Sequence, residues 1–192
     1  MSDKQEAMLK RLGDVLAENT QDRLQYWLEF SNAGTWQFWF NVFIIVAPLI
    51  LLAFALERRQ AFRISFYGLL VHMVFTYIDA FGTLHGFWEY PYKFFPFLTV
   101  SIGLDSSLVP VVYMLLYQWV LNRKKNYYLW FFLLSLAFAF GLKPIMTALD
   151  LFQFYRGANF LHLFAGYYFI ALTSKWITDL FARHQGAAEP AA

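Results

Sequence analysis

The chain has 192 residues, of which 59% are hydrophobic, 22% aromatic and only 15% charged, with a net charge of +2. A soluble domain carries about a quarter charged residues, so this composition excludes an ordinary soluble protein and predicts an integral membrane protein. The lack of cysteine excludes disulfides, thiolate metal sites and cysteine nucleophiles. Because the net charge is small and no basic arm precedes or follows the apolar runs, no nucleic-acid partner is predicted.

Residues 1–36 are expected to form an amphipathic segment ahead of the first apolar run. Their apolar side chains recur at three- and four-residue steps: Met8, Leu12, Val15 and Leu16, then Leu24, Trp27 and Leu28. This pattern predicts a helix that lies in the membrane interface on the outer leaflet. Two alternatives stay open, a lid over an outward-facing cavity and a helix that binds a partner.

Residues 37–178 predict an all-α domain of five transmembrane helices, because each apolar run approaches the roughly 20 residues that a bilayer core requires. The runs are Phe38–Leu56, Ile64–Leu84, Phe97–Leu121, Tyr127–Leu149 and Ala158–Ile177. Pro48, Pro110 and Pro144 lie inside spans and are expected to mark kinks. Residues 179–192 are expected to form a short tail.

The charge of the connections predicts the orientation. Basic residues gather in the first and third connections, as Arg58, Arg59 and Arg63 and as Arg123, Lys124 and Lys125. The positive-inside rule places these connections in the cytoplasm. With five spans, the N-terminus is then outside and the C-terminus cytoplasmic, in a multi-pass protein of the cell membrane.

Four of the predicted spans contain ionisable side chains at a similar depth. Each costs at least ~2.5 kcal/mol near the bilayer centre and therefore calls for a partner or a role. At a rise of about 1.5 Å per residue, Asp79, Asp105, Lys143 and His162 all lie roughly 20–25 Å from the cytoplasmic end, in the outer half of the core. We expect these four residues, with His72 and Tyr113 below them, to form an outward-facing polar binding pocket.

Residues just beyond this layer are expected to rim the mouth of the pocket: His85, Trp88, Glu89, Lys93 and Asp150. A metal held by His85, Asp79, Asp105 and His162 fits by residue type, but their spacing matches no metal motif and no metal is predicted. A different interpretation is structural. Asp79 or Asp105 paired with Lys143 would then be a buried ion pair that fixes helix register.

Three short motifs fall in the second and third spans and in the connection between them. They are Asp-x-Phe-Gly-Thr at Asp79–Thr83, Trp-x-Tyr-Pro at Trp88–Pro91 and, after Asp105 and Pro110, Tyr-Met-Leu-x-Tyr-Gln at Tyr113–Gln118. This pattern resembles an uncharacterised family of small membrane proteins from spore-forming Firmicutes. The resemblance implies five spans and no established activity. The chain has Lys143-Pro144 where relatives have a Glu-Pro pair, so the charge at that position is reversed.

The sequence names no reaction and no cofactor, and three functions stay open. The first is binding or transport of a small polar or amphipathic ligand, although five spans are few for alternating access unless the protein forms a homo-oligomer. The second is a membrane-embedded enzyme that acts on a lipid or isoprenoid through the paired Asp79 and Asp105 as general acid and base. The third is a structural or sensory subunit with an internal ion-pair layer. The expected partners are the lipid bilayer and a small-molecule or lipid ligand.

Overall fold

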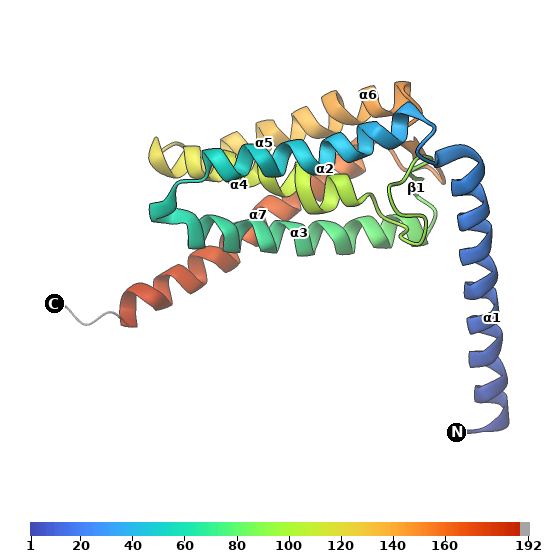
Figure 1. Ribbon diagram of the computed structural model, residues 1–192. Coiled ribbons are helices and arrows are strands. Elements are labelled where there is room, and N and C mark those ends of the chain that lie inside the picture. Colours follow the sequence, from blue (N-terminus) through green and yellow to red (C-terminus); the bar gives the residue numbers. More distant parts are fainter. Residues whose placement is uncertain (189–192) are drawn as a thin grey trace.

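The computed structural model describes residues 1–188 as a helical bundle with one long helix set across its end (Figure 1). The helices are α1 (Asp3–Tyr26), α2 (Trp36–Ala55), α3 (Ala61–Leu84), α4 (Val109–Asn122), α5 (Tyr127–Ala137), α6 (Lys143–Ala148) and α7 (Phe160–Ala188). The shorter elements are the π-helical segments η1 (Trp27–Ser31), η3 (Gly103–Leu108) and η4 (Phe138–Leu142), the 3₁₀ turn η2 (Arg58–Gln60), and the strands β1 (Trp88–Glu89) and β2 (Gln153–Phe154). The all-α class is therefore confirmed.

Four helical stretches within residues 1–188 are long and apolar enough to cross a membrane. They are Trp36–Ala55, Arg58–Leu84, Gly103–Asn122 and Tyr127–Ala148. These stretches correspond to the first four predicted spans and support a multi-pass membrane protein. Helix α7 follows them and packs against α3 and α5.

The boundaries of the third and fifth predicted spans differ from the structure. The third membrane-length stretch begins at Gly103, whereas the sequence predicted Phe97. The chain from 97 to 101 is irregular because its backbone groups bind side chains: the Thr99 carbonyl accepts from Lys93 Nζ, and the Ser101 amide donates to Asp79. Helix α7 continues well past the predicted limit, so the expected tail begins as helix, and residues 189–192 lie outside the described part.

Two of the prolines explain where the π-helical segments occur. A proline inside a helix removes one hydrogen bond and its ring presses on the carbonyl four residues earlier. For Pro110 and Pro144 those carbonyls lie in η3 and η4, where the wider helix accommodates them. Asp105 lies within η3, and Lys143 directly follows η4. At Pro48, by contrast, α2 continues as an α-helix.

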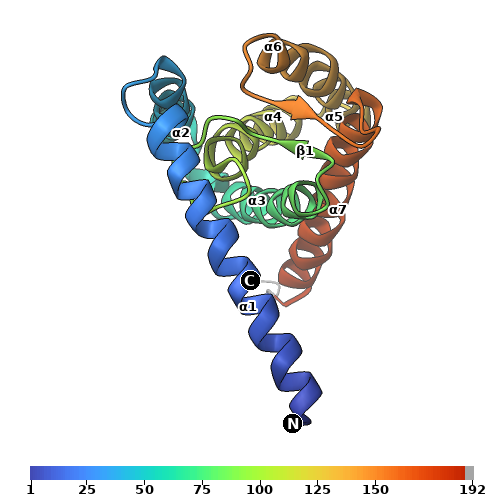
Figure 2. The ribbon, with the colours of Figure 1, turned by 90° about the vertical axis from the view of Figure 1, so that its right-hand side faces the viewer.

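The stretch Gly103–Asn122, made of η3 and α4, is the most buried of the four membrane-length stretches, and α4 lies between the other helices of the bundle (Figure 2). Aromatic side chains form the core around it. The rings of Tyr67 and Tyr117 stack at 4.2 Å, and the Tyr67 and Tyr127 hydroxyls lie 2.7 Å apart. Tyr127 then donates to the Ala171 carbonyl of α7 at 2.8 Å. These contacts join α3, α4, α5 and α7.

At the opposite end from the basic connections, loops and the short strands cover the bundle. β1 pairs antiparallel with β2, with Trp88 opposite Phe154 and Glu89 opposite Gln153. The segment η1 is fastened to the loop after β1, because the Trp27 indole donates to the Lys93 carbonyl at 2.9 Å. Helix α1 therefore leaves the bundle at this end and runs crosswise to the other helices (Figure 1).

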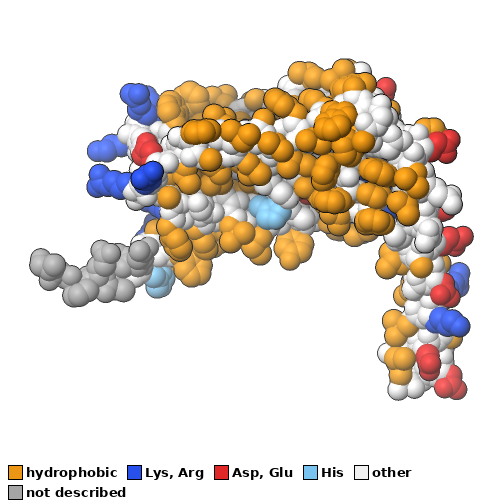
Figure 3. All heavy atoms as spheres, in the orientation of Figure 1, with side chains coloured by type: hydrophobic (Ala, Val, Ile, Leu, Met, Phe, Trp, Pro, Cys, Tyr) orange, Lys and Arg blue, Asp and Glu red, His pale blue; other side chains and the backbone are white. Residues whose placement is uncertain are grey.

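The surface separates into three regions (Figure 3). Hydrophobic side chains cover the length of the bundle, and Lys and Arg gather at the end away from α1. On α1, hydrophobic side chains face the bundle side and charged side chains face away from it. This distribution is expected for a helical bundle that lies in a lipid bilayer with water on both sides.

Candidate functional site

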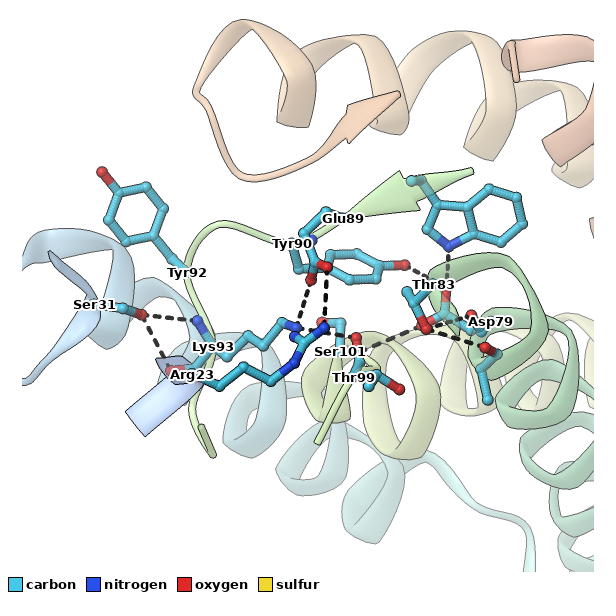
Figure 4. Close-up of polar contacts among 12 residues, drawn as sticks. Arg23, Ser31, Asp79, Thr83, Glu89, Tyr90, Tyr92, Lys93, Thr99 and Ser101 are labelled. Atoms are coloured by element: carbon cyan, nitrogen blue, oxygen red, sulfur yellow. Dashed lines mark hydrogen bonds and ion pairs between the residues drawn. The ribbon is translucent and has the colours of Figure 1, made fainter. Parts of the chain in front are cut away.

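Asp79 lies near the end of α3, and the chain folds back over it. Asp79 is 3% exposed, and its carboxylate receives hydrogen bonds on both oxygens. Oδ1 accepts from the Trp88 indole at 2.8 Å and from the Tyr90 hydroxyl at 2.7 Å, and Oδ2 accepts from the Ser101 amide at 3.4 Å (Figure 4). Together these donors replace the water that the carboxylate loses on burial.

Lys143 approaches the same hydroxyl from α6. Its Nζ donates to the Tyr90 hydroxyl at 3.2 Å and lies 3.7 Å from the centroid of the Phe152 ring. The Tyr90 ring is also within cation–π distance, at 4.8 Å. The lysine and Asp79 are therefore joined through Tyr90 and do not form a direct ion pair. Burial raises the pKa of Tyr90 well above its ordinary value, and the charge of Asp79 raises it further, so the hydroxyl keeps the proton that it donates.

A glycine makes room for the indole that binds Asp79. Gly82 lies one helical turn after Asp79, and a Cβ built on it would fall 1.9 Å from the Cζ2 atom of Trp88. Only glycine permits the indole to lie this close to α3. Glycine at this position thus supports the hydrogen bond between Trp88 and Asp79.

Asp105 is buried in a different environment. It is 1% exposed, and among the described residues neither of its carboxylate oxygens has a hydrogen-bond partner. Nδ1 of His72 lies 2.8 Å from the backbone carbonyl of Asp105, and this oxygen can only accept, so Nδ1 carries the hydrogen. The two buried carboxylates are therefore unequal: that of Asp79 has donors on both oxygens, whereas that of Asp105 has none among the described residues.

A pocket of about 490 Å³ opens at the end of the bundle, between α1 and the two short strands. Its lining residues are Asn19, Asp22, Arg23, Tyr26, Trp27, Ser31, Glu89, Tyr90, Pro91, Lys93, Pro96, Gln153 and Tyr155. We refer to it as the outer pocket.

Glu89 links two cations in the wall of the outer pocket. Its Oε1 accepts from Lys93 Nζ at 2.5 Å, and its Oε2 lies 3.7 Å from Arg23 Nη2 (Figure 4). Burial lowers the pKa of Lys93, while the adjacent Glu89 opposes that effect. Arg23 comes from α1, whereas the other two residues come from the loop around β1, so this cluster also joins the crosswise helix to the bundle.

A second cavity of about 30 Å³ lies deeper, on the other side of Tyr90. Asp79, Lys143 and His162 are among its lining residues. It has room for about one water molecule. Tyr90 borders both spaces, since it also lines the outer pocket.

The structure distributes the predicted pocket residues over several places. Asp79, Lys143 and His162 meet at the small cavity, although the His162 side chain is largely exposed and its Nδ1 accepts from the Asn159 amide at 3.3 Å. Asp105 and His72 contact each other beside them. Tyr113 lies apart, with its hydroxyl on the Tyr167 carbonyl at 3.0 Å.

The predicted rim residues are also divided. Glu89 and Lys93 line the outer pocket, and Trp88 is buried against Asp79. His85 is exposed and bonds the Phe81 carbonyl of its own helix, and Asp150 is exposed in a turn with a φ of 56°. Neither of these two residues lines the outer pocket.

Sequence reasoning missed Tyr90 and Arg23. The signal for Tyr90 was its alternation with Trp88: neighbours two apart in an extended segment point the same way, so both can reach one carboxylate. Arg23 carried no such signal, because only the tertiary position of α1 brings it to the pocket.

No protein-family model matches the chain, and no curated protein or solved structure matches it.

Within residues 1–188, no group of three or more His, Asp or Glu side chains is arranged to hold a metal ion. The four residues that could hold a metal by residue type, His85, Asp79, Asp105 and His162, are therefore not brought together. The function is therefore argued from the geometry of the outer pocket and of the buried residues beneath it.

Proposed function

We propose that the protein crosses the cell membrane five times, with α1 outside and the C-terminus in the cytoplasm. The basic side chains at the end away from α1 support this orientation, because positive loops favour the cytoplasm (Figure 3). The packing of α7 against α3 and α5 supports a fifth span, although α7 is less apolar than the others.

In this arrangement α1 is an interfacial helix on the outer leaflet. Apolar side chains on it are more than half exposed: Met8, Leu9, Leu12, Val15 and Leu16. Their gathering on one face, with charges on the other, favours a helix half immersed in lipid (Figure 3). The end of the same helix forms a wall of the outer pocket, so it combines the interfacial and lid-like roles that the sequence left open.

The outer pocket, in this proposal, binds a small amphipathic ligand. The observation that carries it is the pocket's volume of about 490 Å³, which falls in the usual range of roughly 300–1,000 Å³ for ligand sites. Its wall combines aromatic rings with charged groups, which suits a ligand that has an apolar and a polar part. The pocket also lies at the depth where lipid headgroups would meet the protein.

Native mass spectrometry of the purified protein tests this proposal. Asn19 is exposed and lines the pocket, so Asn19→Trp should fill it, whereas Glu18→Trp places the same bulk on the same helix outside the lining. We expect a bound mass in the wild type and in Glu18→Trp that is missing from Asn19→Trp. Equal occupancy in all three proteins, or a bare wild-type protein, would contradict the proposal.

For the buried layer, the structure favours the structural alternative over the enzyme. Asp79 already has donors on both oxygens, and the small cavity beside it holds about one water, which leaves no room for a lipid substrate at Asp79. We propose that Asp79, Tyr90 and Lys143 hold the floor of the outer pocket in place. Substituting these residues should lower the melting temperature of the protein more than it changes which ligand the outer pocket binds.

A further inference from the structure

The charges in the outer pocket are balanced in number. Arg23 and Lys93 supply two positive charges, and Asp22 and Glu89 supply two negative charges. A ligand with a net charge of either sign would meet as many repelling as attracting groups. A neutral ligand that carries both signs can pair its negative group with the two cations and its positive group with the two carboxylates.

Arg23 has hydrogen-bond donors to spare. In the described structure, the guanidinium of Arg23 uses Nε to bond Asn19 Oδ1 at 2.9 Å, while Nη2 makes only the 3.7 Å ion pair with Glu89. Its two Nη groups therefore present a planar fork that suits two oxygens of a phosphate or carboxylate. Lys93 Nζ lies beside this guanidinium, where it donates to Glu89 at 2.5 Å and to the Thr99 carbonyl at 3.1 Å, and it adds a second positive charge to the same region (Figure 4).

The negative groups lie among aromatic rings. Tyr26, Trp27 and Tyr155 line the pocket together with the two carboxylates. The Trp27 ring is fixed by its bond to the Lys93 carbonyl, and the Tyr155 ring by its hydroxyl bond to Gln153 at 2.8 Å. Aromatic faces combined with carboxylates are the usual means of binding an ammonium or a quaternary ammonium group.

We propose that the ligand of the outer pocket is a zwitterion, in which an ammonium group is joined by a short link to a phosphate or carboxylate. This inference rests on the proposed function and names the chemistry of its ligand. The anionic end pairs with Arg23 and Lys93, and the cationic end lies against Asp22, Glu89 and the aromatic rings. A zwitterionic phospholipid headgroup and a free zwitterionic metabolite share this chemistry.

Calorimetric titration of the protein in a non-ionic detergent distinguishes these sources and tests the charge rule. The probes are dihexanoyl-phosphatidylcholine, glycine betaine, choline chloride and the anionic dihexanoyl-phosphatidylglycerol. We expect at least one zwitterion to bind about tenfold more tightly than both singly charged probes, which is ~1.4 kcal/mol. Binding of the phosphatidylcholine alone assigns the site to lipid, and binding of betaine assigns it to a free metabolite.

Charge variants give a signature that a loss of folding cannot imitate. Arg23→Gln should move the preference toward choline, and Asp22→Asn combined with Glu89→Gln should move it toward phosphatidylglycerol. Arg11→Gln and Glu29→Gln remove exposed charges outside the lining and should leave the preference unchanged.

The zwitterion inference is overturned if choline or phosphatidylglycerol binds the wild type as tightly as the zwitterion that binds better. It is also overturned if neither zwitterion binds, or if the charge variants keep the wild-type preference. The proposed function is decided separately, by whether Asn19→Trp removes a ligand that co-purifies with the wild type. If the ligand is lost in that variant, the outer pocket is a binding site even where the prediction about ligand charge fails.

Discussion

The hydroxyl of Tyr90 donates a hydrogen bond to Oδ1 of Asp79 at 2.7 Å, and both side chains are buried. The same hydroxyl accepts from Lys143 and its ring lines the outer pocket. One side chain thus connects the buried charges of the bundle to the surface that would meet a ligand. The stability of the bundle and the shape of the pocket should therefore change together when Tyr90 is altered.

Tyr90→Phe removes a donor from Asp79 and an acceptor from Lys143 while keeping the ring. A buried group left without its partner costs about 1–3 kcal/mol, so we expect a lower melting temperature in detergent. Tyr155→Phe is the matched control, since that hydroxyl bonds Gln153 at an exposed position. Equal melting temperatures for Tyr90→Phe and Tyr155→Phe would show that the link to Asp79 carries little stability.

Gly82→Ala should displace Trp88, because the new Cβ would lie 1.9 Å from the indole ring. The expected result is a lower melting temperature than that of Gly141→Ala, where nothing lies within 4 Å of the added atom. A Trp88→Phe background lacks the indole atoms Cζ2 and Cη2 that lie nearest the added Cβ, so Gly82→Ala should then cost less. A cost that is the same in both backgrounds would rule out the clash as the cause.

The two buried aspartates should respond in opposite ways to amide substitution. Asp79→Asn removes the charge and places an amide donor against existing donors, so it should destabilise the protein. Asp105→Asn loses no hydrogen bond within the described structure and removes an unpartnered buried carboxylate, so it should be neutral or stabilising. Thermal melts of both variants provide the test, and a larger loss for Asp105→Asn would contradict the assigned environments.

The bond from Trp27 to the Lys93 carbonyl, at 2.9 Å, is one of the contacts that attach α1 to the bundle, together with the bond from the Lys93 amide to Ser31 Oγ at 2.9 Å. Trp27→Phe removes this donor and should make the link between α1 and α2 more sensitive to limited proteolysis. Ligand binding should weaken as well, because α1 forms one wall of the pocket. Trp36→Phe, at a residue 53% exposed and outside the lining, is the control and should be cut at the wild-type rate.

Hydropathy and helix rise alone predicted much of this architecture. The apolar runs located the four membrane-length helices, since a bilayer requires about 20 such residues. Counting the rise from each basic connection also placed Asp79 and Lys143 at one depth, and in the structure both bond the same hydroxyl. Depth could be counted from the sequence because an α-helix rises by about 1.5 Å per residue.

Contacts around the outer pocket could not be predicted in the same way. The pocket depends on the fold of the loop from 85 to 102 and on the direction in which α1 leaves the bundle, and neither follows from periodicity. Asp79 was expected beside Lys143, yet Tyr90 lies between them because β1 folds back over the end of α3. Tertiary placement of short irregular segments decided these contacts.

Cysteine labelling in intact cells tests most directly whether the pocket faces outward on a five-span membrane protein. The natural chain has no cysteine, so a single introduced thiol is unambiguous. Tyr155→Cys reports on the pocket, Lys125→Cys on the opposite end and His184→Cys on the far end of α7, and all three positions are exposed. With a membrane-impermeant maleimide, we predict labelling of Tyr155→Cys in intact cells and labelling of the other two only after lysis. Labelling of Lys125→Cys in intact cells, or protection of Tyr155→Cys, would contradict the outward-facing pocket, and early labelling of His184→Cys would contradict the fifth span.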